Sequence, residues 1–399
     1  MSEQKNSNVW VQIASLSVAL LLYTTSMTTP ALAEIAKAFP EAAPETIKLI
    51  STIPSLMMVF FALISGKLTQ YISIKKIITI AMVLIFIGGI PSAFVGNLQF
   101  MIVMRFVFGA GYGLVFPMAS AVITDLFTGQ QANKLMGFKS AVGAAAGMVF
   151  QMMGGILAAY NWRFSFLGFI LVIPIALIIW FKLPDTGVKK PEKVDASGVK
   201  EKKLTTMTYV LALVCALLNI VQFCFMTNLA MVMKADGIGN AAQSATVLSV
   251  FTAAAFVVGL LYGNISKILK QFSASIGALF VGLSFVVLIL ANSMATLIIG
   301  AIIFGIGFGM FNPAIVIAVA KSATKPKYAA VAISIYVSGT GIGQFLSPYV
   351  LKILRETFNL TASRADWQIA AVTLIVGSVI SVVLVALSLK NAKEITQEA

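Results

Sequence analysis

Arg105 is the cation that lies well inside an apolar run of the sequence, at the head of RFVFGAGYGLVFP (105–117). A charged side chain inside a bilayer is costly and normally faces protein or a water-filled cavity. Arg105 is therefore a candidate for contact with an anionic solute or for a proton-linked switch. It lies about 10 Å below the outer end of its run, so anchoring by snorkelling, or pairing with Glu34, is the alternative.

Uncharged polar side chains gather on the first, fourth, seventh and tenth apolar runs, with additions on the fifth and eleventh. The third, sixth, ninth and twelfth runs hold almost nothing polar beyond serine and threonine, and we expect them to face lipid. This alternation predicts a central cavity, although bonding within or between helices is the alternative for each residue. The candidates for a substrate path are Tyr23, Thr25, Arg105, Tyr112, Gln151, Asn219, Gln222, Asn312, Tyr336 and Gln344.

Proton coupling requires an ionisable group in or near such a path, and the interiors of the predicted helices hold no acid. Glu34 lies at the outer end of the first run and Asp125 at the inner end of the fourth. The coupling candidates are therefore Glu34, Arg105 and Asp125. Lys139 or Lys134 is a possible partner for Asp125.

Other kinds of chemistry find little support. The sequence has no histidine and no acidic or cysteine cluster with ligand spacing, so we expect neither a metal nor a cofactor. Cys215 and Cys224 are nine residues apart, which places them on opposite sides of one helix where they cannot form a disulfide. The G-x-x-x-x-G-K-[ST] nucleotide loop is missing, so direct use of ATP is not expected.

The elements that must position these residues are membrane helices. Of the 399 residues, 59% are apolar and 11% are charged, and the mean hydropathy is +0.97. Soluble domains have about 25% charged residues. Twelve apolar runs are long enough to span a bilayer. They cover residues 9–32, 46–66, 77–96, 98–121, 138–159, 164–182, 205–229, 243–266, 274–292, 295–320, 329–351 and 367–389.

The distribution of lysine and arginine predicts the orientation, because positive loops stay cytoplasmic. With the N-terminus inside, 20 of the 28 basic residues fall on the cytoplasmic side and seven on the outer side. We therefore expect an integral protein of a bacterial cytoplasmic membrane with both termini cytoplasmic. The net charge of +14 fits contact with anionic lipid, and no nucleic-acid partner is expected.

The chain divides into two similar halves. The polar segment 183–204 is a predicted cytoplasmic linker between a six-helix bundle at 1–182 and a second at 205–399, which ends in a short tail. At a spacing of 196 residues, FGAGYGLVFP (108–117) aligns with FGIGFGMFNP (304–313). The repeat predicts two pseudo-symmetric bundles with a substrate site between them. The small-xxx-small glycine pairs within it predict close helix packing.

Three motifs make the chain resemble the major facilitator superfamily over essentially its full length. The fourth run carries R-x-x-x-G-x-G-x-G with a following proline, the entry to the sixth reads W-R-x-x-F, and Leu-Pro-Asp follows the sixth. The matching residues are Arg105, Gly109, Gly111, Gly113, Pro117, Trp162, Arg163, Phe166, Leu183, Pro184 and Asp185. The nearest resemblance is to drug and metabolite exporters with twelve helices.

The sequence departs from the family at two motifs. The loop between the second and third runs has Gln70, Tyr71 and Ser73 where the family pattern G-x-L-x-D-R-x-G-R-[KR] has Asp, Arg and Gly. The exporter motif G-P-x-x-G-G of the fifth run is kept only in Gly154 and Gly155.

The resemblance implies an all-α membrane protein of the major facilitator fold that is a secondary transporter, not an enzyme, and works by alternating access. The first hypothesis is proton-coupled export of a small amphipathic organic compound by an antiporter. The alternative is an uptake carrier or exchanger for a small organic anion, and a non-transporting sensor is disfavoured. We expect a small-molecule substrate, membrane lipid and a coupling proton as partners, and a monomer.

Overall fold

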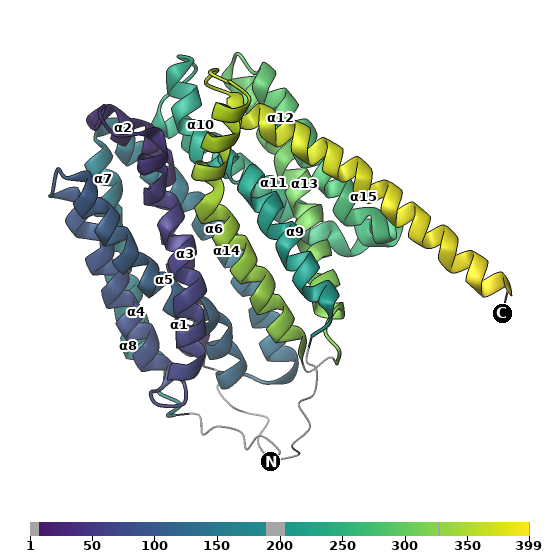
Figure 1. The fold of residues 1–399 in the computed structure, drawn as a ribbon. Helices are drawn as coiled ribbons and strands as arrows, with labels where there is room; N and C mark the ends of the chain where they lie inside the picture. Colours follow the sequence, from purple (N-terminus) through teal and green to yellow (C-terminus); the bar gives the residue numbers. More distant parts are fainter. Residues whose placement is uncertain (1–7, 189–203, 326–327, 399) are drawn as a thin grey trace. The chain divides into compact units, whose positions relative to one another are not determined.

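The computed structural model describes residues 8–188, 204–325 and 328–398, and it is almost entirely helical (Figure 1). Most of the predicted linker, 183–204, lies outside these residues. An isolated β-bridge joins Leu204 to Ala323. The α-helices of the first half are α1 (Val9–Tyr23), α2 (Leu32–Ala38), α3 (Pro44–Leu68), α4 (Ile74–Gly89), α5 (Leu98–Leu126), α6 (Gly129–Tyr160), α7 (Trp162–Leu167) and α8 (Val172–Lys182). Those of the second half are α9 (Thr206–Gln222), α10 (Cys224–Ala235), α11 (Ala241–Leu269), α12 (Ser273–Leu290), α13 (Met294–Lys321), α14 (Ala329–Thr357) and α15 (Ala365–Glu398).

The chain forms two compact units, which we describe separately. Unit 1 comprises Met1–Glu201 and Asn240–Thr246, and unit 2 comprises Lys202–Gly239 and Val247–Ala399. Unit 2 has two separate hydrophobic clusters among its described residues, and in the larger one Phe225, Phe251, Phe285 and Phe304 pack edge to face or stacked.

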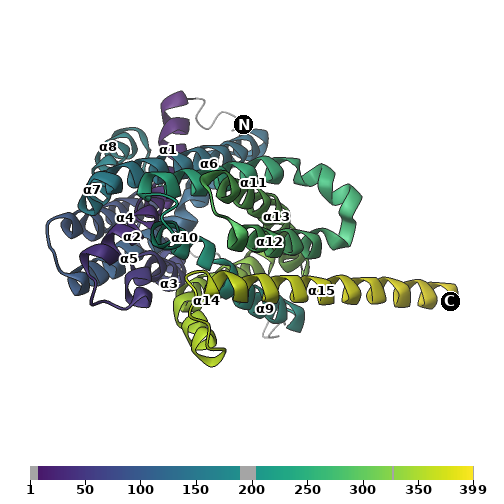
Figure 2. The ribbon, with the colours of Figure 1, turned by 90° about the horizontal axis from the view of Figure 1, so that it is seen from above.

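Eleven segments of the described chain are long and apolar enough to cross a membrane. One of them, Ala241–Leu290, has 50 residues, about 75 Å of helix, whereas a bilayer core is about 30 Å thick. This segment reverses at η5 (Lys270–Phe272), where Lys270 has φ 48°, and continues as α12 (Figure 2). The predicted eighth and ninth runs are thus two passes, and the predicted spans agree with the helices to within a few residues at most ends.

Glycine contacts repeat between the halves. A Cβ added at Gly111 would lie 2.6 Å from the Ala81 carbonyl oxygen, and one at Gly307 would lie 2.6 Å from that of Gly277. Both pairs are 196 residues apart. Gly109 packs on Met57 of α3, while Gly305 packs on Ala254 of α11, 197 residues further on. The packing role predicted for these glycines is confirmed.

The first and seventh spans are broken at equivalent places. In unit 1, η1 (Thr24–Met27) and η2 (Thr29–Ala31) separate α1 from α2; in unit 2, Phe223 separates α9 from α10. Hydroxyls and a proline weaken the first helix, because Thr24 donates to the Leu21 carbonyl at 2.7 Å and Pro30 has no N–H. In unit 2, Ser347 donates to the Ile220 carbonyl at 2.6 Å, which supplies a partner for a carbonyl at the break.

The helices predicted to face lipid have exposed apolar faces within their own units. Val83 of α4, Leu177 of α8, Leu283 of α12 and Val372 of α15 are all exposed. The C-terminal part of α15 extends as a single long helix (Figure 1).

Candidate functional site

The polar side chains of unit 1 meet where α1 gives way to η1. The ring of Tyr23 fills the groove over Gly143 and Gly147 of α6, where an added Cβ would come within 2.5 to 3.0 Å of the ring. Two turns further along α6, a Cβ at Gly154 would collide with the Met27 backbone. The glycines of α6 therefore hold the broken segment of the first span and set the position of the Tyr23 phenol.

Three further candidates of unit 1 are Tyr112 on α5, Gln151 on α6 and Thr25 within η1. The ring of Tyr112 lies between Phe108 and Phe116 of its own helix, at centroid distances of 6.4 and 6.2 Å. Gln151 is 2% exposed and has no hydrogen bond within the described chain. Thr25 uses its carbonyl to accept the Thr28 hydroxyl at 3.3 Å. Gln151 is therefore a buried polar group of unit 1 whose amide has unused bonding capacity.

Helices α9, α13 and α14 bring together the candidates of unit 2. The Tyr336 hydroxyl donates to Asn312 Oδ1 at 2.9 Å, and Asn219 Nδ2 donates to the Cys215 carbonyl at 2.9 Å. Asn219 also lies against Gly343, whose added Cβ would be 3.1 Å from its Cβ. These groups form one polar face of unit 2 beside the α9 break.

Two amides complete this description. Gln222, the last residue of α9, is 6% exposed, and Gln344 on α14 is half-buried. Neither makes a hydrogen bond within the described residues.

Arg105 lies elsewhere. Its side chain is fully buried, and Nη2 donates to the Gly88 carbonyl at 2.6 Å. The guanidinium carbon lies 4.7, 5.2 and 5.3 Å from the ring centroids of Phe108, Phe166 and Phe169. Nε and Nη1 have no hydrogen-bond partner among the described residues. Arg105 therefore neither snorkels nor pairs with Glu34 here, and its hydrogen bond and ring contacts among the described residues involve none of the other path candidates.

The fold of α4 explains the acceptor that Arg105 uses. Pro91 lacks an N–H and is the second residue of the 3-10 turn η3 (Ile90–Ala93), so the backbone N–H groups that would bond the last carbonyls of α4 are missing or displaced. Gly88 lets α5 approach so closely that an added Cβ would lie 2.2 Å from the Phe108 nitrogen. Arg105 thus donates a hydrogen bond to a carbonyl in the last turn of α4, inside the bundle.

The two acids proposed for coupling lie at helix ends and are half-buried. Glu34 is in the first turn of α2, and Asp125 is near the end of α5. Both lysines suggested as partners of Asp125 contact other groups. Lys139 donates to the Ser120 hydroxyl, and Lys134 lies 5.8 Å from the Phe138 ring centroid.

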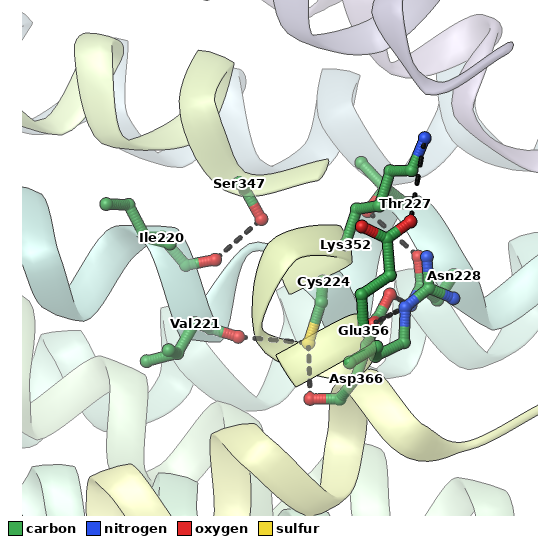
Figure 3. Close-up of polar contacts among 10 residues, drawn as sticks. Ile220, Val221, Cys224, Thr227, Asn228, Ser347, Lys352, Glu356 and Asp366 are labelled. Carbon is green, nitrogen blue, oxygen red and sulfur yellow. Dashed lines mark hydrogen bonds and ion pairs between the residues drawn. The ribbon is translucent and has the colours of Figure 1, made fainter. Parts of the chain in front are cut away.

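A buried acid that the sequence analysis missed lies in unit 2. Asp366 is 2% exposed in the first turn of α15 and accepts a hydrogen bond from Asn228 Nδ2 of α10. Arg355 Nε lies 3.1 Å from Asp366 Oδ1, as an ion pair without hydrogen-bond alignment. Figure 3 shows Asp366, Asn228 and Cys224 together. Asp366 lies in the first turn of α15, at a helix end like Glu34 and Asp125, and the predicted span, 367–389, begins one residue after it.

Cys224 connects this acid to the break. Its thiol donates to the Val221 carbonyl at 2.9 Å and lies 3.7 Å from the Asp366 carbonyl oxygen (Figure 3). Both cysteines are free and buried. The prediction that they share one continuous helix is wrong, since Phe223 interrupts it.

A second ion pair lies at the same end of unit 2. Arg364 Nη2 is 2.7 Å from Asp236 Oδ2, and Arg364 Nη1 donates to the Leu288 and Ile289 carbonyls at 3.2 and 2.6 Å. These carbonyls end α12, where a cation is favourable. This pair ties α10, α12 and α15, and its side chains are more exposed than that of Asp366.

The sequence matches the profile of the Major Facilitator Superfamily over residues 14–348 and again over 211–398. The chain belongs to this superfamily. It is a membrane transporter, not an enzyme, and its fold is the all-helical one expected, with twelve helices in two bundles.

Curated relatives in the superfamily differ in the substrates that their names give. The chain is 35% identical over 122 residues to the multidrug transporter protein MdtP of Bacillus subtilis, covering 28% of this chain and 22% of the relative. It is 26% identical over 145 residues to the putative niacin/nicotinamide transporter NiaP of Bacillus subtilis, covering 36% of each. The chain spans between 22% and 37% of the length of the first three such relatives.

Solved superfamily structures share the fold at low identity. A D-xylose–proton symporter has a TM-score of 0.70 at 13% identity, covering 93% of this chain and 96% of that one. A POT family transporter in complex with a thioalcohol-conjugated peptide has a TM-score of 0.73 at 15% identity, covering 95% and 96%.

The superfamily loop between the second and third helices is altered in this chain, yet it binds the Leu-Pro-Asp motif. Ser73, at the usual glycine place, donates to the Asp185 carboxylate and caps α4. The Gly187 N–H bond contributes most to lowering the pKa of Asp185, and the Ser73 hydroxyl, Lys76 and Lys75 lower it further. Asp185 therefore stays ionised and holds the loop to the end of α8.

Proposed function

We propose that this superfamily member exports a small amphipathic organic compound in exchange for protons, by alternating access. The observation that carries the proposal is the enclosure of Arg105 by Gly88 and three phenylalanine rings. Because the Arg105 side chain is enclosed in this way, the groups left to line a substrate path are phenols, amides and a hydroxyl. Such groups bind an uncharged or weakly charged compound with an apolar body and a few polar atoms.

Broken helices in both units support transport at these residues. Discontinuous helices line substrate sites in many transporters, because their free backbone groups and polar side chains face a cavity. Tyr23 lies at the break of unit 1 and Gln222 at that of unit 2. The name of another relative, the MFS-type efflux pump MMF1 of Pseudozyma antarctica, 26% identical over 203 residues, favours export.

For coupling, we propose that Asp366 is the group that takes up and releases the proton. It is the most deeply buried of the acids considered, and it binds Asn228, five residues after the break at Phe223. Protonation would neutralise the partner of Arg355 and weaken the hold on α10. The charged and titratable groups around this site are Arg355, Cys224, the Lys352–Glu356 pair at 3.9 Å and the Arg364–Asp236 pair.

The experiment is transport by purified protein in liposomes, with substrates first identified by thermal-shift screening. A proton gradient should drive substrate flux, and substrate flux should move protons detectable with an internal pH dye. Asp366→Asn should abolish both effects, while substrate exchange without a gradient continues. Asp236→Asn is the matched control, because it removes an acid from the neighbouring ion pair, and it should keep coupling.

A second function, uptake or exchange of a small organic anion, remains as the alternative. It is favoured by the name of another relative, the 4-hydroxybenzoate transporter PcaK of Pseudomonas aeruginosa, 27% identical over 136 residues. Flux that depends on an anionic counter-solute and ignores the pH gradient would establish this alternative and refute export with protons. If proton-coupled flux survives in Asp366→Asn, only the role of Asp366 is refuted, and the proposal of proton-coupled export stands.

A further inference from the structure

An apolar groove runs between α4 and α8 on the surface of unit 1. Its volume is about 550 Å³, and all its lining residues except Thr79 are apolar. It extends from Thr79 to Ile87 along α4 and from Trp180 to Val172 along α8. Eight residues of helix correspond to about 12 Å, close to the roughly 15 Å hydrocarbon depth of one leaflet.

The equivalent helices of unit 2 are closed against each other. At a spacing of 196 residues, Phe86 of the groove corresponds to Gly282 of α12, where an added Cβ would lie 2.8 Å from Ile375 of α15. Thr79 corresponds to Ser275, whose hydroxyl is 2.6 Å from that of Ser381. Small residues bring α12 and α15 together, whereas the Phe86 ring lines an open groove in unit 1.

One end of the groove is cationic. Lys75 Nζ donates to the Trp180 carbonyl at 2.7 Å and lies 5.9 Å from the Trp180 ring centroid. An ammonium has three donors, so two remain for another acceptor. Lys76 and Lys182 are exposed beside it, and Asp185 offsets one of these charges.

We infer that this groove binds an acyl chain of an anionic phospholipid, whose headgroup phosphate contacts Lys75, Lys76 and Lys182. The occupant follows from three features together: an apolar trough on the membrane-facing side of a spanning bundle, a depth of one leaflet, and positive charge at one end only. Basic residues near a bilayer surface attract anionic lipids, and the predicted orientation places this end in the cytoplasmic leaflet. The inference is independent of the transported substrate.

Trp180 supplies the probe, because it lines the groove and is 54% exposed. The protein carries four tryptophans, and Trp10 is the other exposed one, at 56%. Two variants are compared, Trp10→Phe and the double variant Trp10→Phe with Trp180→Phe. The difference between their fluorescence intensities is the signal of Trp180. Protein in phosphatidylcholine bilayers is titrated with brominated phosphatidylglycerol or with brominated phosphatidylcholine.

Brominated phosphatidylglycerol should quench Trp180 at several-fold lower mole fraction than brominated phosphatidylcholine. Each lysine near the surface contributes about fivefold, so Lys76→Gln with Lys182→Gln should remove most of the preference. Lys267→Gln, an exposed lysine on α11, is the charge control and should keep it. Ala176→Phe, inside the groove, should reduce quenching by both lipids.

A salt titration of otherwise unaltered protein checks the result without changing the lysines. Raising ionic strength to about 1 M should reduce the preference, because it shortens the screening length to about 3 Å. Equal quenching by the two lipids, or a preference that survives both salt and the double lysine change, would overturn the proposal.

Discussion

The fourth span, in unit 1, and the tenth span, in unit 2, share the same glycine and proline motif, yet they differ at one buried position. Arg105 of α5 is enclosed by three aromatic rings and bonded to a carbonyl, while its counterpart Ala301 of α13 is fully buried in the apolar core. The difference lies in the partner helix: α4 breaks at Gly89–Pro91, whereas α12 continues to Leu290 and has Val287 at the proline place. A repeat can therefore keep its glycine packing while one half acquires a charge, provided that a neighbouring helix end supplies an acceptor.

The strongest test of this difference is to place an arginine in unit 2 at the position equivalent to Arg105. Ala301→Arg should destabilise the protein by about 4 kcal/mol or more, because it buries a charge without a partner and overfills the core. Yield and apparent melting temperature in detergent measure the effect. Ala301→Met, of similar length without charge, should cost about 1–3 kcal/mol. Equal losses in the two variants would mean that size, not charge, separates the halves.

The reverse change removes the charge from unit 1. Arg105→Ala should cost about 2–4 kcal/mol, because it leaves a cavity among the rings and an unbonded Gly88 carbonyl. Since the hydrogen bond and ring contacts of Arg105 involve no other path candidate, the KM for a transported substrate should not change. A raised KM at unchanged melting temperature would instead place Arg105 in the substrate path.

A third pair of changes tests the architecture that the halves share. Gly111→Val and Gly307→Val should each cost about 1–3 kcal/mol, because each side chain would meet a backbone oxygen at 2.6 Å. Gly137→Ala is the control, since nothing lies within 4 Å of its added Cβ, and it should be neutral or slightly stabilising. A loss confined to one half would show that the repeat is not equivalent in packing.

The smallest effect concerns the loop of unit 1 that binds the end of α8. Asp185→Asn should lower stability by about 0.5 kcal/mol or less, because the carboxylate is exposed. Its pKa is lowered from 3.8, so its contribution is present above pH 3.8 and is lost as pH falls through the lowered value. Melting curves of both proteins across this range should converge at the acidic end. A difference that grows on acidification would exclude this role for Asp185.

The sequence alone predicted the helices well, because long apolar runs and charged loops report directly on what a bilayer accepts. The glycine register also followed from the repeat. The hydrogen-bond partners of the polar side chains could not be predicted in the same way. The polar stretch 23–29 signalled something unusual, but hydroxyls bond within a helix or across helices with the same composition. That α1 would end at Tyr23 depends on α6 glycines more than 100 residues away.

The charged residues show the same limit. Arg105 was recognised from its surroundings, but its acceptor depends on the end of α4 at Gly88, which no spacing specifies. Asp366 was overlooked because an error of two residues in a helix start placed it outside the span. Its burial depends on Asn228 and Arg355 from two other helices, and that convergence is a property of the folded unit.

The broken seventh span also gives the protein two built-in chemical reporters. Cys215 and Cys224 lie on either side of Phe223, in separate packed clusters of unit 2. Alkylation of each thiol by a membrane-permeant maleimide can proceed only when its own cluster opens, so two rates would time the motions on the two sides of the break. Because Cys224 donates to Val221, an adduct there would also remove that bond and hold the opened form long enough to be isolated.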